Sequence, residues 1–77
     1  MDRDTARAAI VAKIAEQFSL DPAEIQDEDN LAKKFGAKSH DIVQLNVKVQ
    51  VALGIKIGYA QARKLLTVGD WVDFATK

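Results

Sequence analysis

The sequence predicts a small all-α four-helix bundle, with three main helices, one short helix and a long first loop. Two observations lead to this class: apolar residues recur at three- and four-residue spacing, and glycine or proline interrupts each run. The chain has only 77 residues, no cysteine and one histidine. Because it has neither disulfides nor a cysteine–histidine zinc set, its stability must come from one apolar core. We therefore expect residues 1–77 to form a single folded, soluble domain.

Apolar spacing predicts the first helix over residues 4–18. Ile10, Ile14 and Phe18 follow one another at four-residue intervals and form one apolar stripe. After it, the run Asp21-Pro22-Ala23-Glu24 is typical of an N-cap followed by a first-turn proline, which predicts one short helical turn. Residues 26–30 are acidic and irregular, so we expect a long connection. Three apolar side chains should hold it to the core: Ile25, Leu31 and Phe35.

The second main helix is expected from Ser39 to a stop at Gly54, a favourable position for left-handed backbone. Valines at 47, 49 and 51 alternate as in a strand, but the longer spacing of Ile42, Leu45, Val49 and Leu53 favours a helix.

A short third helix is predicted over residues 59–65, with basic residues in its last turn, where the helix dipole favours them. Thr67 and Asp70 have the spacing of a capping box that opens the last helix. That helix supplies four apolar side chains: Trp71, Val72, Phe74 and Ala75.

Acidic and basic residues are concentrated in different segments of the chain, although the formal net charge is zero. Residues 1–32 carry eight acidic and three basic side chains, which gives −5, whereas residues 33–64 carry seven basic and one acidic, which gives +6. A solvated face and a partner-binding surface both explain this sorting. The longest apolar run, residues 8–12, is far too short to span a bilayer, so we expect a cytoplasmic chain.

The sequence lacks the usual catalytic and metal-binding motifs. Ser39, His40 and Asp41 are consecutive, and consecutive residues on a helix point about 100° apart, which excludes a hydrolase triad. A calcium loop starting at Asp27 would have Ala32 and Lys38 where glycine and glutamate are required. No glycine-rich phosphate loop occurs. We therefore expect a protein that is not an enzyme and has no metal site.

Ser39 itself has two interpretations, a helix cap or a functional hydroxyl. The run from Leu31 to Leu45, LAKKFGAKSHDIVQL, resembles the signature of the acyl carrier protein family, in which the serine carries 4′-phosphopantetheine. Further similar blocks lie at residues 14–18, 21–22, 53–55 and 67–70. The resemblance implies an attachment site at Ser39, flanked by Lys38, His40 and Asp41. The family usually has Asp and Leu where this chain has Lys38 and His40.

The resemblance also implies which residues meet partners and cargo. Family members dock through acids on the second and third helices, but no acid lies between Ile42 and Leu66 here. Such a basic or neutral surface would repel basic docking patches and fit partners with acidic ones. The implied docking residues are Gln44, Lys48, Lys56, Arg63 and Lys64. The implied acyl pocket consists of Val43, Val49, Ile57, Ala62, Leu65 and Trp71, with Trp71 either at its floor or at its rim.

The implied function is a specialised acyl carrier that holds acyl intermediates as thioesters for fatty-acid, lipid or polyketide-type biosynthesis. Its implied partners are a phosphopantetheinyl transferase, which uses coenzyme A, and acyl-activating, condensing or acyl-transfer enzymes; we expect a monomer. Two alternatives stay open: a peptidyl or aminoacyl carrier, and an interaction module that is never modified. Nucleic-acid binding is disfavoured, because the basic segment lacks interleaved stacking aromatics.

Overall fold

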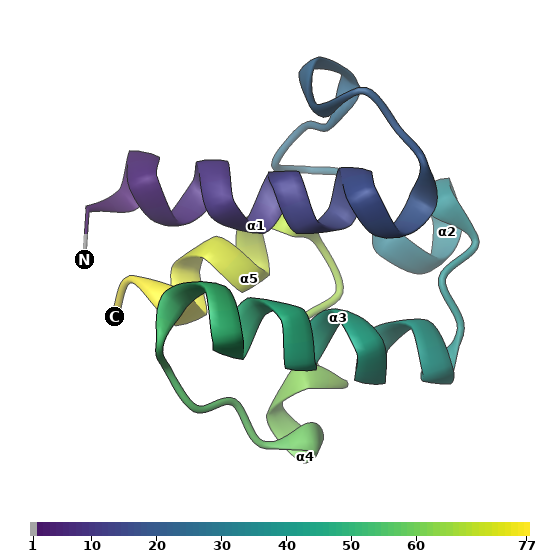
Figure 1. Cartoon of the computed structure of the whole chain (residues 1–77). Coiled ribbons are helices and arrows are strands. Elements are labelled where there is room, and N and C mark those ends of the chain that lie inside the picture. Colours follow the sequence, from purple (N-terminus) through teal and green to yellow (C-terminus); the bar gives the residue numbers. More distant parts are fainter. Residues whose placement is uncertain (1) are drawn as a thin grey trace.

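A computed structural model describes residues 2–77 and confirms the all-helical class. The elements of this part of the chain are α1 (Arg3–Phe18), the 3-10 turn η1 (Pro22–Glu24), α2 (Leu31–Phe35), α3 (Ser39–Leu53), α4 (Tyr59–Ala62) and α5 (Val68–Ala75). Helices α1 and α3 lie side by side and run in opposite directions (Figure 1). Helix α5 packs against α1, and α4 packs against α3.

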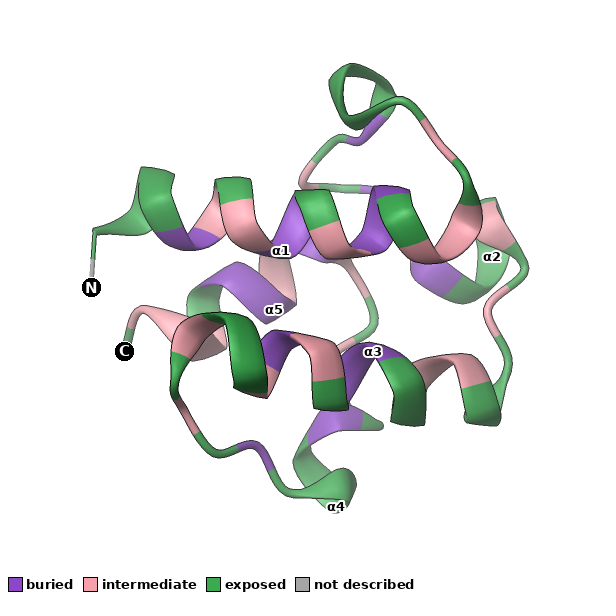
Figure 2. Ribbon diagram, in the orientation of Figure 1, coloured by how far each residue is buried: buried purple, intermediate pink, exposed green. Residues whose placement is uncertain are grey.

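Helix α1 forms where the apolar spacing predicts it. Its first turn is capped by Asp2, whose Oδ2 accepts a hydrogen bond from the backbone N–H of Thr5 at 3.1 Å. It ends at Ser19, whose φ of 56° is left-handed. The residues of its inner face are buried: Ala6, Ile10, Val11, Ile14 and Ala15. Figure 2 shows buried positions of α1, α3 and α5 turned toward the interior, where the single core lies.

The long first connection contains a helix that the sequence analysis missed. Asn30 begins α2, because its Oδ1 accepts from the N–H of Lys33 at 3.0 Å, and Gly36 ends it with a φ of 70°. The predicted anchors are confirmed: Ile25 and Leu31 are buried, and the ring of Phe35 stacks on that of Phe18 with centroids 6.0 Å apart. Asparagine before the segment and glycine after it are helix-boundary signals that could have revealed α2.

Helix α3 is also confirmed, including its stop at Gly54 with a φ of 65°. The three alternating valines do not form a strand. Val49 is fully buried, whereas Val47 and Val51 are 55% and 80% exposed, as a helical period requires.

The third helix is shorter than predicted, and its basic residues lie beyond it. Helix α4 ends at Ala62, so Arg63 and Lys64 lie in the turn that follows instead of in a last helical turn. After Ala62 the N–H groups of Lys64 and Leu65 donate to carbonyls three residues back, at 3.0 and 3.1 Å, and the N–H of Leu66 donates to Asp70 Oδ2 at 3.1 Å. These bonds take the place of the four-residue pattern that a longer α-helix needs.

The predicted capping box of α5 is confirmed. Thr67 Oγ1 accepts from the N–H of Asp70 at 3.1 Å, and Asp70 Oδ2 accepts from the N–H of Thr67 at 3.1 Å. Val68, Trp71 and Val72 of this helix are fully buried.

Backbone hydrogen bonds join residues 27–31 to residues 66–69. Besides the bond between Leu31 and Leu66, the N–H of Val68 donates to the carbonyl of Asp29 at 3.1 Å, and that of Gly69 donates to the carbonyl of Asp27 at 2.8 Å. Asn30 and Thr67 face each other as an antiparallel bridge. This clasp of residues 27–31 and 66–69 holds the first loop against the start of α5.

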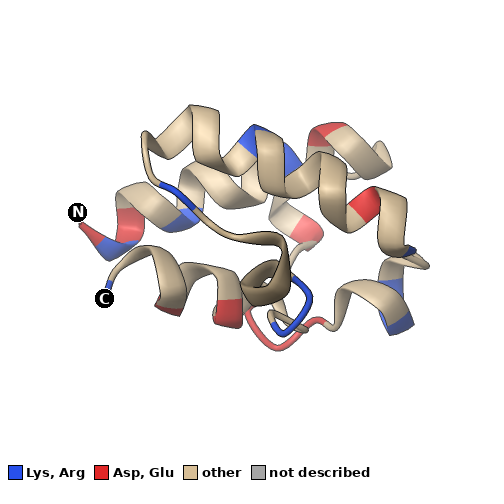
Figure 3. Ribbon diagram, turned by 90° about the horizontal axis from the view of Figure 1, so that it is seen from below, with Lys and Arg blue, Asp and Glu red and all other residues tan. Residues whose placement is uncertain are grey.

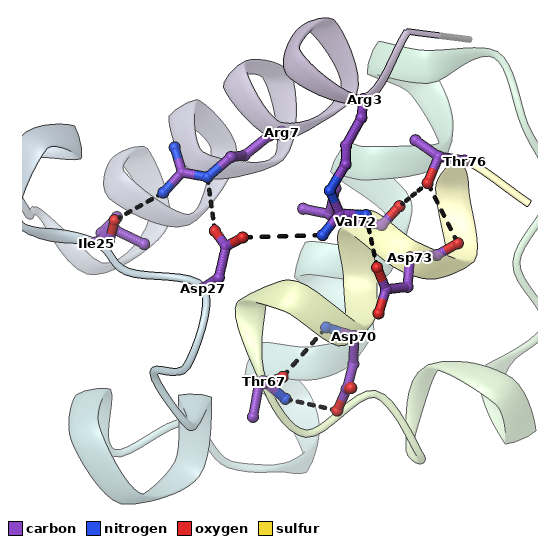
Figure 4. A network of polar contacts seen from close by, with 9 residues as sticks. All are labelled: Arg3, Arg7, Ile25, Asp27, Thr67, Asp70, Val72, Asp73 and Thr76. Carbon is purple, nitrogen blue, oxygen red and sulfur yellow. Dashed lines mark hydrogen bonds and ion pairs between the residues drawn. The ribbon is translucent and has the colours of Figure 1, made fainter.

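Charged side chains tie α1 to the same loop and to α5 (Figure 4). Arg7 Nε lies 2.6 Å from Asp27 Oδ1, and its Nη2 donates to the carbonyl of Ile25 at 3.2 Å. Arg3 Nη1 lies 2.6 Å from Asp73 Oδ1 on α5, and its Nη2 lies 3.8 Å from Asp27 Oδ2. The side chains of these pairs are between 36% and 60% exposed, so solvent screens the pairs and each contributes little to stability.

The loss of folding stability at acid pH should depend on the protonation of Asp29. The N–H of Gln26 donates to Asp29 Oδ2 at 2.8 Å and holds the pKa of this carboxyl below its ordinary value of 3.8; burial acts against this shift, and Lys34 Nζ, 3.0 Å from Oδ1, reinforces it. The carboxylate therefore stabilises the fold fully above about pH 4, and this contribution is lost as the pH falls through the lowered pKa.

We expect Asp29→Asn to unfold at lower urea than the wild type near neutral pH, and to lose less of its remaining stability on acidification. Urea unfolding followed by circular dichroism at several pH values measures both effects. Glu28→Gln, an exposed neighbour in the same loop, is the matched control and should behave as the wild type. Equal acid sensitivity of Asp29→Asn and the wild type would contradict this role.

Candidate functional site

Ser39 is the first residue of α3, and its side chain is exposed. The helix cap is made by other groups: the N-cap residue is Lys38, and Asp41 Oδ2 accepts from the N–H of Lys38 at 2.8 Å. Only this half of a capping box is possible, because a lysine side chain has no acceptor. The helix-cap interpretation of Ser39 is therefore wrong, and the cap does not consume its hydroxyl.

The entrance of α3 is attached to α1 through the side-chain amide of the partly buried Gln17. Gln17 Nε2 donates to the backbone carbonyl of Asp41 at 2.6 Å. His40 lies outside this contact: its side chain is 70% exposed, and Nε2 lies 3.4 Å from Asp41 Oδ1. Asp41 thus positions the first turn of α3, while His40 faces solvent.

A cavity of about 200 Å³ opens beside Ser39. Its walls come from α2 and Asn30, from the start of α3, and from α4 with the turn after it. Most of the lining is apolar: Leu31, Ala32, Ala37, Ile42, Ala62, Leu65 and Leu66. The polar lining residues are Asn30, Lys38, Ser39, Tyr59 and Arg63. The exposed hydroxyl therefore stands at the edge of an apolar hollow that also has two cationic residues.

Of the six residues expected to form an acyl pocket, only Ala62 and Leu65 line this cavity. Val49, Ile57 and Trp71 are buried in the core, and Val43 is 43% exposed on the outer side of α3. Trp71 is not at a rim: it is fully buried, and its indole N–H donates to the carbonyl of Leu65. It thus supports the cavity wall from behind. Tyr59 and Leu66 were not predicted as lining residues, and neither were those from α2 and the start of α3, because the cavity lies between segments that are distant in sequence.

Comparison with curated proteins finds acyl carrier proteins. That of Helicobacter pylori strain G27 is 38% identical to this chain over 65 residues, which are 84% of this chain and 83% of the relative. The chain belongs to the acyl carrier protein family. The acyl carrier proteins of Helicobacter pylori strain 26695 and Helicobacter acinonychis strain Sheeba match the same shares at 37% and 38% identity. No family model matches the chain.

The residues expected to dock partners of this acyl carrier protein lie on three segments. Gln44 and Lys48 are on α3, Lys56 is in the loop before α4, and Arg63 and Lys64 follow α4. Figure 3 shows Lys and Arg spread over several elements when the molecule is seen from the side of α4.

These docking candidates differ in how far each is engaged within the fold. Lys48 Nζ lies 3.7 Å from Glu16 Oε1 on α1, and its side chain is one-third exposed. Arg63 lies over the ring of Tyr59, with its Cζ 5.8 Å from the ring centroid. Gln44, Lys56 and Lys64 are exposed. Among the cations of residues 33–64, Lys34 and Lys48 thus lie beside carboxylates of other segments, at 3.0 and 3.7 Å.

Residues 2–77 contain neither a membrane-spanning helix nor a metal-binding cluster of side chains. None of the helices is both long and apolar enough to cross a membrane. No group of three or more His, Cys, Asp or Glu side chains in this part of the chain is arranged to hold a metal ion.

Removing the Asp41 carboxylate should loosen the entrance of α3. Because it satisfies the N–H of Lys38 and lies in the first turn, we expect Asp41→Ala to lower the free energy of unfolding by about 1 kcal/mol. The backbone amides of residues 38–41 should exchange with solvent faster. Hydrogen exchange by NMR and urea unfolding measure these effects. His40→Ala, which removes only an exposed side chain, should change the stability by less than about 0.5 kcal/mol.

Proposed function

We propose that this family member carries acyl groups on a 4′-phosphopantetheine arm attached to Ser39. One observation carries the proposal: the Ser39 hydroxyl is exposed at the entrance of a 15-residue helix, free of the cap and beside an apolar cavity. When attached, the arm supplies a thiol on which an acyl group travels as a thioester.

The residues around Ser39 fit such a group. A phosphodiester on this hydroxyl would meet the positive end of the α3 dipole, which favours an exposed anion by roughly 0.3–1 kcal/mol. Lys38 adds a positive charge beside it. The apolar walls of the cavity, among them Ile42, Ala62 and Leu65, offer shelter to an acyl chain. Each methylene that leaves water there contributes about 0.8 kcal/mol.

No residue that the structure describes around Ser39 is placed to act as the base that its hydroxyl needs to bond to phosphorus. The Asp41 carboxylate accepts the N–H of Lys38, and the exposed His40 lies beside Asp41. A phosphopantetheinyl transferase must therefore supply the base that takes the hydroxyl proton, and coenzyme A as the donor. Ser39 Oγ bonds to the phosphorus as the pyrophosphate bond of coenzyme A breaks, and the 3′-phosphorylated adenosine 5′-phosphate part of coenzyme A leaves with the electron pair of that bond. In this reaction the chain is a substrate and not an enzyme.

Attachment at Ser39 predicts a defined mass change. Incubation with coenzyme A and a broad-specificity transferase should add one phosphopantetheine to the wild type and none to Ser39→Ala, as measured by intact-protein mass spectrometry. An unmodified wild type would contradict the proposal and favour the interaction module, in which Lys38 and His40 block the transferase. The cargo mass on protein from its own host separates acyl from aminoacyl or peptidyl loading.

We also infer a dedicated set of partners with acidic docking surfaces. In the described chain, the stretch from Ile42 to Leu66 has no acid and exposes Gln44, Lys56 and Lys64. Fatty-acid, lipid or polyketide-type enzymes with basic patches would be repelled by it. Acidic patches would be attracted, and the attraction would weaken with salt.

Charge reversal on these segments should weaken recognition by the transferase of the same host. We expect Lys56→Glu with Lys64→Glu, both at exposed positions, to raise its KM roughly tenfold, because attraction becomes repulsion at two sites. Lys33→Glu makes the same kind of change on α2, an element outside the proposed docking segments, and is the matched control. A KM that is unchanged by the double substitution, or changed equally by the control, would contradict the docking proposal.

A further inference from the structure

We propose that Arg63 and Lys38 bind the phosphodiester of the arm on Ser39, so that the base of the arm is held over the cavity. This inference rests on the proposed attachment and adds a ligand-binding role for Arg63. It departs from the expectation that Arg63 serves partner docking.

Both cations belong to residues that line the same cavity as Ser39. Lys38 directly precedes Ser39, whereas Arg63 comes from the end of α4, and all three line one hollow of about 200 Å³. Within residues 2–77, neither Lys38 nor Arg63 takes part in an ion pair, whereas Lys34 and Lys48 do. Two uncommitted cations beside one serine are suited to an anion attached there.

Tyr59 orients the guanidinium of Arg63. The two residues are one helical turn apart, and Arg63 Cζ lies 5.8 Å from the ring centroid. The backbone supports this arrangement, since the N–H of Arg63 donates to the carbonyl of Tyr59 at 3.0 Å. A guanidinium stacked on a ring keeps the N–H groups along its edge for an anion and loses less freedom on binding.

The charge around the cavity favours the same ligand. The one acid of residues 33–64 is Asp41, and its carboxylate is engaged by the N–H of Lys38. Apart from Lys38 and Arg63, the polar lining residues are the uncharged Asn30, Ser39 and Tyr59, and the rest of the lining is apolar. A phosphodiester at Ser39 would thus meet two positive groups and one already engaged carboxylate.

The neighbouring Lys64 provides a matched control. It is exposed, carries the same charge and follows Arg63 directly, but it does not line the cavity. If Arg63 binds the arm, substitutions at positions 63 and 64 must differ in their effect on binding of the phosphodiester. If both residues only attract partners, the two substitutions must behave alike.

The first experiment uses the modified protein. In the wild type we expect the Arg63 Nε–Hε resonance to shift between the unmodified and modified forms, and the ³¹P line of the arm to move toward that of a free phosphodiester at about 1 M salt. Arg63→Gln with Lys38→Gln should give the high-salt ³¹P position at every salt concentration, Arg63→Lys an intermediate one, and Lys64→Gln the wild-type behaviour. A wild-type ³¹P line that salt does not move would overturn the proposal.

A second experiment separates this inference from the attachment itself. The unmodified protein is titrated with free 4′-phosphopantetheine and, separately, with pantetheine, which lacks the phosphate. We expect 4′-phosphopantetheine to shift Arg63 Nε–Hε, Arg63→Gln to weaken binding roughly tenfold, and Lys64→Gln to leave it unchanged. Pantetheine should not move the Arg63 resonance. If a transferase adds no mass, the proposed function fails, yet this titration still decides whether Arg63 binds the phosphate. Equal weakening by the two substitutions would overturn that binding.

Discussion

The backbone clasp between residues 27–31 and 66–69 is the constraint on which the site depends. It brings a loop from the first half of the chain against the turn that precedes α5, and the bond between Leu31 and Leu66 lies within it. Both of these residues line the cavity beside Ser39. The Trp71 indole, bonded to the Leu65 carbonyl, holds the same turn from the core side. The cavity wall is thus set by contacts between segments that are distant in sequence.

Different residues have different roles at the start of α3. The Asp41 carboxylate accepts from the backbone N–H of Lys38, the Gln17 amide attaches the turn to α1, and Ser39 lies at the surface. A serine that capped the helix would have its oxygen occupied by a backbone donor. Here Ser39 is the first helical residue and not the N-cap, so the turn forms and the serine side chain stays exposed.

Basic residues that are close together in the sequence have different surroundings in the fold. Lys48 belongs to the basic segment, but Glu16 of α1 lies beside it; Arg63 lies over Tyr59, whereas Lys64 is exposed. Adjacent cations therefore have different surroundings in the fold. Summing charges by segment cannot detect this, because it ignores which groups other elements bring near.

The sequence alone determined the elements whose signals are local. The apolar stripe of α1, the stop of α3 at Gly54 and the capping box of α5 each lie within a few residues, and each formed as predicted. The sequence also singled out Ser39 and the family. Tertiary structure decided the end of α4, the exposed position of Val43 and which residues surround the cavity, because these depend on hydrogen bonds and packing between segments far apart in the chain. Periodicity and capping patterns report only on neighbours within a turn or two, so they carry no information about such pairings.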